Sequence, residues 1–594
     1  MSIGFTARTT LGTLPLILIA AVAQGWALYG LHIAIDREAW PATHPGALFG
    51  MYAIAVFIPP MIQMLAQHAR QMAMWLMVAI VGALYGCFGW HFGTQISGDV
   101  SNLRNSDDWL PVAFALFVLT LLVLPFVQMR LVTGRWAANY ELLFSSAWNN
   151  ALVLAEAVLF TGLFWLLLLL WGQLFHMLGI DFFKALFSEP IFIYPITSIA
   201  FGIALHLIGS LERLTSVVLQ QLLSVLKWLA LIAGLILALF TIALVMRLPE
   251  MIASGDRAIS AAWLLWLIAV TVLLVNAAYR DGSVEQPYPR LIALGLRLVL
   301  PLTVVIAATA LYALYLRIDH HGLTVGRVWA SIVAIAACIY ALGYAIACKD
   351  KQRWMGGISR INVIVAVFLI VAIAAALTPL LSPQRLAANS QFARALQERP
   401  AQEAGAEVAM PYRYLRFDAG RYGTARLQEL AALQDHPRAE EIRSEATAAL
   451  SQESREDRTV ATHTIDSLVA GLRIFPAGRV LDDALMAELE QELHEPQLVG
   501  VVTAGSASGL FVDLNADAVE DFVLLAGPVG AVFQNDSGRW KYVAALNSNE
   551  MQRNDHITAA LEAGDIQVRE PQWRDLLIGR HRYRFVAEHR EDAD

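Results

Sequence analysis

The chain has 594 residues, of which 57% are hydrophobic and only 15% are charged, and its net charge is −8 at pH 7. Charged residues make up about a quarter of a typical soluble globular protein. The composition therefore excludes an ordinary soluble enzyme and favours a membrane protein.

Charge divides the chain near residue 383. Residues 1–383 contain 20 Lys and Arg against 16 Asp and Glu, whereas residues 384–594 contain 22 against 34. The first part consists of long apolar segments, and the second is charged and amphipathic. We predict a membrane domain at 1–383, followed by acidic soluble residues whose charge argues against binding to nucleic acid or to an anionic lipid surface.

Eleven segments of the first part are apolar enough to cross a lipid bilayer, which requires about 20 consecutive residues in a helix. They are residues 11–34, 47–67, 73–93, 109–129, 150–176, 190–210, 222–246, 260–279, 291–316, 326–347 and 361–381. Ala21-Val22-Ala23 resembles a signal-peptide cleavage site, but only Arg8 precedes it as a charge and further spans follow. We therefore interpret the first segment as an uncleaved helix.

Basic residues gather in the loops on one side of these predicted spans. Eleven Lys and Arg lie on the N-terminal side and seven on the opposite side. Because basic loops stay in the cytoplasm, the N-terminus is predicted to be cytoplasmic. An odd number of spans then places residues 384–594 outside the cell membrane, in the periplasm of a Gram-negative cell. An even number would place them in the cytoplasm.

Polar residues inside the predicted spans are candidate functional residues, because burial of such a group is costly unless it finds a partner. They are Asn149, Asn150, Glu156, His176, His206, Lys227, Asn276 and Arg297. A pair of Glu156 with Lys227 or Arg297 would relay protons or ions in a transporter. The alternative is that Glu156 only links helices and that Lys227 extends to the interface.

A polar turn, RIDHHGLTVGRVWA at 317–330, separates the ninth and tenth predicted spans. Gly322 permits a tight turn, and Thr324 is placed to cap the next helix. Arg327 falls in the first turn of that helix, where a cation opposes the helix dipole, so we expect a compensating carboxylate or lipid headgroup. The Asp-His-His sequence at 319–321 offers metal-ligand types, but adjacent residues rarely converge on one ion.

This turn resembles a bacterial membrane-protein family known as domain of unknown function 4153. The stretches SSAWNNALVLAEAVLFTGLFWLLL and YRYLRFDAGRYGTARLQELA are also similar to that family. The resemblance covers most of the chain from about Trp148 onward, and it implies a multi-pass protein of the bacterial inner membrane without supplying an activity. His321 stands where the family usually has Tyr. The signature positions are Arg317, Gly322, Leu323, Thr324 and Arg327.

The acidic part divides into a charged helical segment at 384–498 and a small β-rich domain at 499–594. Helical spacing of apolar residues occurs at 390–404, 423–434, 437–452 and 481–495. Strand patterns follow at 498–505, 509–514, 521–527, 530–534, 540–546 and 580–588, with a hairpin signal at 535–538. We therefore predict an α-helical polytopic membrane protein followed by a soluble α+β domain with a small antiparallel sheet.

The loop between two of these strands has the spacing of a calcium loop. Asp513, Asn515, Asp517, Val519 and Asp521 occupy alternate positions, with Val519 offering its backbone carbonyl. The pattern resembles the strand–loop–strand element of integrin-type propeller repeats, in which D-x-[DN]-x-D-x-x-x-D binds calcium. This resemblance implies calcium as the one cofactor, in a structural role. A single copy cannot close a propeller.

Two alanines depart from the calcium-loop pattern. Ala516 and Ala518 stand where glycine is expected. An alanine held at positive φ costs about 1–2 kcal/mol, which would weaken a site without abolishing it. The alternative interpretation is a polar turn whose carboxylates cap their own backbone N–H groups.

Three classes of function are compatible with this sequence. The first, which we predict, is an envelope sensor or scaffold whose outer domain meets a protein partner. The second is a secondary transporter or an ion- or proton-coupled permease that uses Glu156, Lys227 and Arg297. The third, an intramembrane enzyme, is the weakest, because the sequence contains no HExxH, no GxSxG and no phosphate-binding P-loop.

Overall fold

The structure is a computed structural model. It describes residues 10–96, 109–136, 139–254, 260–282, 287–350, 354–397, 406–452, 472–476, 479–492, 508–526, 529–536, 538–547, 561–563, 566, 576–578 and 581–583. The chain forms two compact units. Unit 1 comprises Met1–Gln397 and Pro411–Leu450, and unit 2 comprises Glu398–Met410 and Ser451–Asp594.

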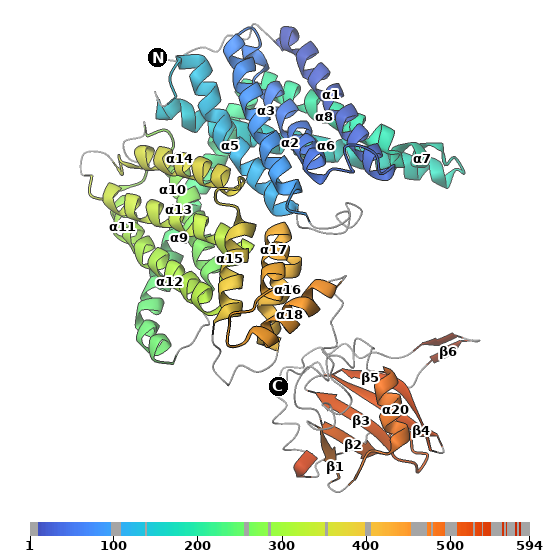
Figure 1. Ribbon diagram of the computed structural model, residues 1–594. Coiled ribbons are helices and arrows are strands. Elements are labelled where there is room, and N and C mark those ends of the chain that lie inside the picture. Colours follow the sequence, from blue (N-terminus) through green and yellow to red (C-terminus); the bar gives the residue numbers. More distant parts are fainter. Residues whose placement is uncertain are drawn as a thin grey trace. The chain divides into compact units, whose positions relative to one another are not determined.

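Unit 1 is a bundle of membrane-spanning helices (Figure 1). Eleven spans in the described residues are long and apolar enough to cross a membrane, so the predicted multi-pass architecture is confirmed. The ninth span combines α11 and α12. The helices are α1 (Thr10–Asp36), α2 (Pro45–Met64), α3 (Met72–Gly93), α5 (Leu110–Thr133), α6 (Tyr140–Met177), α8 (Pro190–Ser210), α9 (Glu212–Ser254), α10 (Ala261–Tyr279), α11 (Arg290–Val299), α12 (Thr303–His321), α13 (Val325–Ala347) and α14 (Ile358–Ala376).

The core of the bundle lies where apolar side chains of neighbouring spans interlock. One cluster joins α2, α3, α5 and α14 around the fully buried Leu65 and Met74. Another joins α9, α10, α12 and α13 around Leu237 and Ile306. Such close packing holds helices together in a bilayer, where lipid chains are as apolar as the side chains themselves.

Prolines lie inside several of the described spans, and a proline has no backbone N–H to donate to the helix. Pro60 leaves the carbonyl of Val56 without its helical partner, and Gln24 of α1 donates its Nε2 to that oxygen at 3.3 Å. Pro301 lies in a 3-10 turn at Leu300–Leu302 that separates α11 from α12. The helical hydrogen bond lost in α2 is thereby replaced by one from a buried polar side chain of the neighbouring helix.

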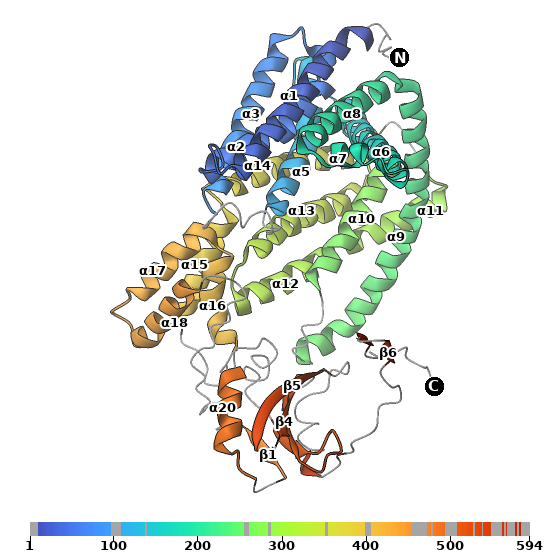
Figure 2. The same cartoon turned by 90° about the vertical axis from the view of Figure 1, so that its right-hand side faces the viewer.

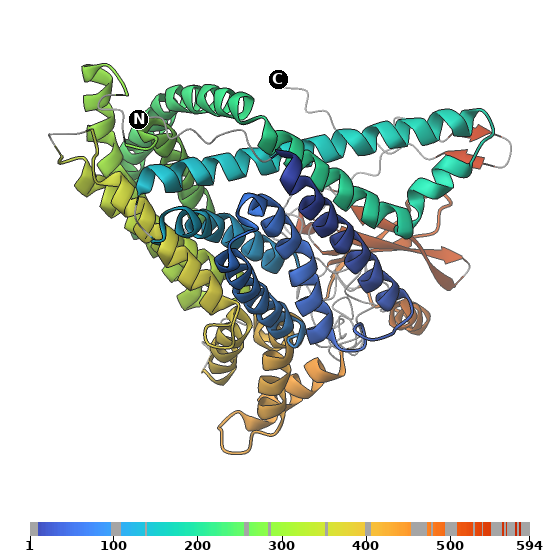
Figure 3. The same ribbon diagram turned by 90° about the horizontal axis from the view of Figure 1, so that it is seen from above.

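Helix α6 is much longer than a bilayer requires. Its 38 residues reach about 57 Å at 1.5 Å per residue, whereas the hydrocarbon layer is about 30 Å thick. Figure 3 shows α6 as one long, unbroken helix. Beyond its apolar stretch the chain turns back through α7 (Phe182–Ser188), where Phe183 packs on Phe175 with ring centroids 4.7 Å apart.

Four further helices follow the last span and gather beside the end of α12 (Figures 1 and 2). Their buried core includes Tyr412, Leu427 and Ile442. The helical predictions at 423–434 and 437–452 are confirmed, and that at 390–404 is confirmed up to Leu396, since residues 398–405 lie outside the described residues. The helices are α15 (Pro383–Leu396), α16 (Ala406–Phe417), α17 (Gly420–Ala431) and α18 (Ala439–Ser451).

Unit 2 contains a five-stranded sheet in its described residues. The strand order is β1 (Arg473–Phe475), β2 (Ser508–Val512), β3 (Asp521–Ala526), β4 (Val529–Asp536) and β5 (Arg539–Asn547). Strands β2 to β5 pair antiparallel as predicted, but β1 runs parallel to β2, so the sheet is mixed. A parallel neighbour requires a crossover connection, and α20 (Asp483–Glu492) lies in the segment between β1 and β2.

One face of the sheet packs on α20. Leu485 and Leu489 of this helix bury against Phe522, Phe533 and Trp540. The predicted hairpin joins β4 to β5, and the predicted strand at 498–505 lies outside the described residues. A short second hairpin pairs β6 (Leu576–Ile578) with β7 (His581–Tyr583), and only β7 lies within the predicted strand at 580–588.

Candidate functional site

The signature turn connects α12 to α13 at residues 321–325. Gly322 has φ +69° and ψ 177°, a backbone conformation that is almost restricted to glycine. Thr324 caps α13 as predicted, because its Oγ1 accepts a hydrogen bond from the backbone N–H of Arg327 at 3.3 Å. The turn is therefore sharp, and its backbone groups need partners from elsewhere in the fold.

Two hydroxyl groups from the helices after the last span supply acceptors for the turn. Ser390 of α15 accepts from the backbone N–H of Leu323 at 2.8 Å. Tyr414 of α16 accepts from the backbone N–H of Val325 at 2.7 Å. Each hydroxyl lies more than sixty residues away in the sequence from the amide that it binds.

Gln391 of α15 supplies hydrogen-bond donors to the turn. Its Nε2 donates to the carbonyl oxygens of His321 at 3.0 Å and Leu323 at 2.9 Å. The same amide lies so close to Gly322 that an added Cβ would be 2.8 Å from it. Absence of a side chain at 322 therefore permits both the backbone conformation and the approach of α15.

Arg327 binds the C-terminal end of α12. Its Nη1 donates to the carbonyl oxygens of His321 at 3.2 Å and Gly322 at 2.5 Å. The compensating partner is thus a pair of backbone carbonyls at the negative end of a helix dipole, rather than the expected carboxylate or lipid headgroup. Arg317 is exposed on α12 and makes no hydrogen bond or ion pair in the described part of the chain.

We call this arrangement the signature junction; it comprises residues 321–325, Arg327, Ser390, Gln391 and Tyr414. A second contact lies close by, where the backbone N–H of Arg421 donates to the carbonyl of Gln95 at 3.0 Å. The four helices α15 to α18 are consequently attached to the end of the third span as well as to the end of the ninth.

A polar network joins four spans in the bundle. The Oδ1 of Asn276 in α10 accepts from Tyr344 of α13 at 3.0 Å and from Asn362 of α14 at 2.8 Å. Asn362 also donates to the hydroxyl of Tyr140 in α6 at 2.6 Å. Asn276 was predicted from the sequence and Asn362 was not, although an asparagine at the start of an apolar span is a signal for such a partner.

A second amide pair links α5 to α6. Asn150 is buried and exchanges two hydrogen bonds with Gln128, at 2.8 and 3.1 Å. Asn149 is exposed on the same helix. Asn150 therefore satisfies its amide by joining two helices.

The structure does not bring Glu156 together with Lys227 or Arg297. Glu156 is half-buried on α6 and forms no ion pair or hydrogen bond in the described residues. The Nζ of Lys227 lies 5.1 Å from the ring centroid of Tyr288 and 5.4 Å from that of Trp228, which are cation–π distances. Lys227 thus extends toward aromatic side chains rather than toward a carboxylate.

The two predicted histidines lie apart from these networks. His176 contacts Asp181 in the turn between α6 and α7, and both side chains are exposed. His206 is half-buried on α8 without a hydrogen bond among the described residues. Neither histidine belongs to a group of candidate metal ligands in the residues that the structure describes.

The Asp-rich loop between β2 and β3 is a self-capped turn. Its side-chain oxygens accept from its own backbone: Asn515 from Asp517 at 3.0 Å, Asp517 from Val519 at 2.8 Å and Asp513 from Ala518 at 2.9 Å. Ala518 has φ +68°, the positive angle that its place in the pattern predicts. These hydrogen bonds are those that a polar turn makes to its own backbone.

Asp521 closes this loop from inside the sheet. It is 2% exposed, and its Oδ2 accepts from the backbone N–H of Leu514 at 3.2 Å. Burial raises the pKa of Asp521, and the nearby Asp517 and Asp513 raise it further. The Oδ1 atoms of Asp513 and Asp521 are buried without a hydrogen-bond partner. In the described residues no three His, Cys, Asp or Glu side chains are arranged to hold a metal ion.

Comparison with known proteins relates these features to a family. The profile of the family described as "Domain of unknown function (DUF4153)" matches residues 54–417, more than half of the chain. The chain belongs to this family. The DUF4153 match begins in α2, well before the predicted start near Trp148, and ends with α16 at Phe417.

Only one of the two candidate sites, the signature junction, lies within the residues that the DUF4153 profile matches. All residues of the signature junction lie inside the matched range, and the Asp-rich loop lies outside it. The predicted likeness of that loop to an integrin-type propeller repeat receives no support from the comparison. No curated protein and no solved structure matches the chain.

Proposed function

We propose that this DUF4153 protein is an envelope scaffold or sensor. Its membrane bundle would anchor a C-terminal domain on the extracytoplasmic side, where that domain meets a protein partner. The observation that carries the proposal is the signature junction, because it binds the helices after the last span to the end of the bundle through side chains rather than through chain connectivity alone.

The junction makes two parts of the protein depend on each other. Three side chains of α15 and α16 satisfy backbone groups of the α12–α13 turn, and each hydrogen bond contributes about 0.5–1.5 kcal/mol. A turn without these partners would hold unsatisfied polar groups beside the membrane. A partner that displaced α15 or α16 would therefore break the hydrogen bonds of the turn. A scaffold or sensor requires such coupling between its outer domain and its membrane bundle.

Contacts inside unit 1 support the predicted side of the C-terminal residues. Gln95 follows the third span, the signature turn follows the ninth, and α15 follows the eleventh. All three meet in hydrogen-bonded contacts with α15 to α17, so they share one side of the membrane. An even number of spans must therefore separate Gln95 from α15, which agrees with the eight spans that the described residues form between them. The side of the membrane on which Gln95 and α15 lie then depends on the predicted cytoplasmic N-terminus and on the three spans that precede Gln95.

The described contacts favour a scaffold over the alternative of a transporter. Asn150 bonds to Gln128, and Asn276 bonds to Tyr344 and Asn362; both networks tie spans together. Glu156 has neither of the basic partners that an ion relay would need. A fixed bundle that holds an outer domain is the simpler use of such cross-links.

We also propose that the Asp-rich loop takes calcium as a structural ion. Support comes from the unpartnered Oδ1 atoms of Asp513 and Asp521 and from the three neighbouring carboxylates, whose repulsion a cation would relieve. Calcium titrated into the full-length protein should give saturable heat that is lost in Asp517→Ala. An absence of heat in the wild-type protein would leave the loop a polar turn.

The scaffold proposal is tested by comparing two variants in native membranes. Blue native electrophoresis should show a complex larger than the protein alone in the wild type and in Glu156→Gln. Gly322→Ala, which disrupts the signature junction, should lose that complex. If Glu156→Gln instead reproduced the phenotype of a deletion while the complex stayed intact, the transporter would be the better interpretation.

A further inference from the structure

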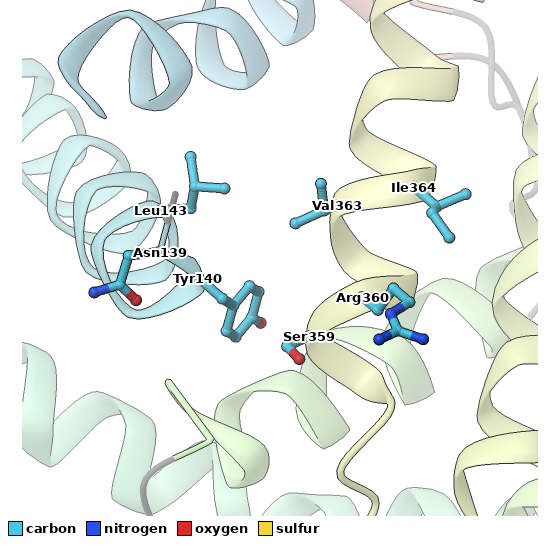
Figure 4. A pocket seen from close by; sticks show the side chains of 7 residues that line it. All are labelled: Asn139, Tyr140, Leu143, Ser359, Arg360, Val363 and Ile364. Atoms are coloured by element: carbon cyan, nitrogen blue, oxygen red, sulfur yellow. The ribbon is translucent and has the colours of Figure 1, made fainter. Parts of the chain in front are cut away.

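A cavity of about 230 Å³ opens between α6 and α14 (Figure 4). It lies near the start of both helices. The signature junction lies elsewhere, where α12 ends and α13 begins. Its lining residues are Asn139, Tyr140, Leu143, Ser359, Arg360, Val363 and Ile364.

The cavity has a polar end and an apolar end. Asn139 directly precedes α6, and Ser359 and Arg360 are the second and third residues of α14, so these polar groups lie at the membrane boundary. One turn further along, Leu143 and Val363 face each other across the cavity, as Figure 4 shows. A ligand that spans both ends must carry polar and apolar groups.

The polar end offers donors. The guanidinium of Arg360 is exposed and forms no hydrogen bond or ion pair in the described part of the chain, and the hydroxyl of Ser359 is equally without a partner there. The Oδ1 of Asn139 accepts from the backbone N–H of Glu141 at 3.0 Å, which leaves its amide N–H groups for a ligand. Glu141 does not line the cavity. A cation with hydroxyl and amide donors favours an oxyanion.

The cavity is placed to open toward lipid. Among the eleven described spans, those of α6 and α14 are the least buried, with 11% and 17% of their most apolar stretches covered by protein. The remaining surface of these two helices faces the hydrocarbon when the protein is in a membrane. A free phosphate would use the donors but leave Leu143, Val363 and Ile364 without a partner, whereas a phospholipid would cover both.

We propose that this cavity binds an anionic phospholipid. The phosphate binds at Arg360 and Ser359, and the first acyl carbons lie on Leu143 and Val363. A basic pocket between spans at the membrane boundary is the chemistry by which such headgroups are recognised. The inference does not depend on the proposed scaffold function, since it concerns the other end of the bundle.

Native mass spectrometry of the full-length protein, titrated with phosphatidylglycerol or phosphatidylcholine in detergent, tests the proposal. The wild type should retain phosphatidylglycerol in preference to phosphatidylcholine. Arg360→Gln should weaken phosphatidylglycerol binding about fivefold, the effect of one charge near the membrane surface. Arg290→Gln is the matched control, because Arg290 is likewise exposed in the first turn of a span and does not line the cavity.

A second variant keeps the proposal testable if Arg360→Gln fails to fold. Val363→Phe fills the apolar end without changing charge, and it should also weaken retention of phosphatidylglycerol. Equal retention of the two lipids, or an equal loss in Arg290→Gln, would overturn the proposal. Displacement of the lipid by inorganic phosphate at similar concentration would also overturn it, since it would identify a soluble anion as the ligand.

Discussion

Replacement of Gly322 by alanine should release α15 from the membrane bundle. The backbone at 322 has φ +69° and ψ 177°, where a side chain is strongly disfavoured. An added Cβ would also lie 2.8 Å from Gln391 Nε2 and 3.1 Å from Ser390 Oγ, the two atoms that bind the turn. The substitution therefore strains the turn and displaces its partners together.

The expected cost follows from these two effects. Strain at such a backbone position is about 1–3 kcal/mol. The displaced side chains make three hydrogen bonds to the turn, each worth about 0.5–1.5 kcal/mol. A combined loss of about 4 kcal/mol corresponds to roughly a thousandfold larger population with α15 undocked.

Limited proteolysis of the full-length protein measures that population directly. Trypsin should cleave after Arg385 and Arg394 of α15 much faster in Gly322→Ala than in the wild type, because cleavage requires local opening. Gly326→Ala is the matched control, since a Cβ at 326 meets no atom within 4 Å. It should cleave at the wild-type rate or more slowly, because alanine favours a helix.

The outcome that refutes this reasoning is also specific. If Gly322→Ala and Gly326→Ala were cleaved at the same rate, the turn would tolerate a side chain. The hydrogen bonds from Ser390 and Gln391 would then contribute little to docking of α15, and the signature junction would not couple the two parts of the protein.

Three further predictions concern the polar contacts. Gln128→Leu and Asn150→Leu should each lower the thermal unfolding midpoint, and the double variant should show a coupling of about 0.6–1.7 kcal/mol, whereas strict additivity would mean that the amides do not interact. Asn362→Leu removes three hydrogen bonds and should destabilise the bundle by about 1–3 kcal/mol in the same assay, with an unchanged midpoint as the contrary result. The pKa of Asp521 is raised in the folded protein, so its contribution to stability is present below the ordinary pKa and lost as pH rises through the raised value. Asp521→Asn should therefore flatten the pH dependence of unfolding of the sheet, and an identical profile would contradict that role.

The spans could be predicted from the sequence because a bilayer imposes a simple rule on length and apolarity. The partners of the signature turn could not. Gly322 and Thr324 predict a capped turn from local chemistry, but nothing local indicates that Ser390 and Gln391 complete it. Contacts over such separations depend on how helices pack, which a pattern in one sequence does not encode.

The sheet shows the same limit. The hairpin at 535–538 follows from turn residues that favour it, and the structure has it there. Strand β1 has only three residues at Arg473–Phe475 and no alternation of apolar and polar side chains. It is a strand because β2 offers an edge beside it, so its parallel pairing is a property of the fold rather than of its own sequence.

The side of the membrane on which the C-terminal domain lies is the most direct test of the proposed function. In a variant without Cys87, Cys338 and Cys348, a cysteine would replace Val480, which is 82% exposed, or Arg290 at the start of α11. A membrane-impermeant maleimide applied to spheroplasts should label the Val480→Cys protein at once and the Arg290→Cys protein only after lysis. Labelling in the reverse order would place the domain in the cytoplasm and contradict an envelope scaffold.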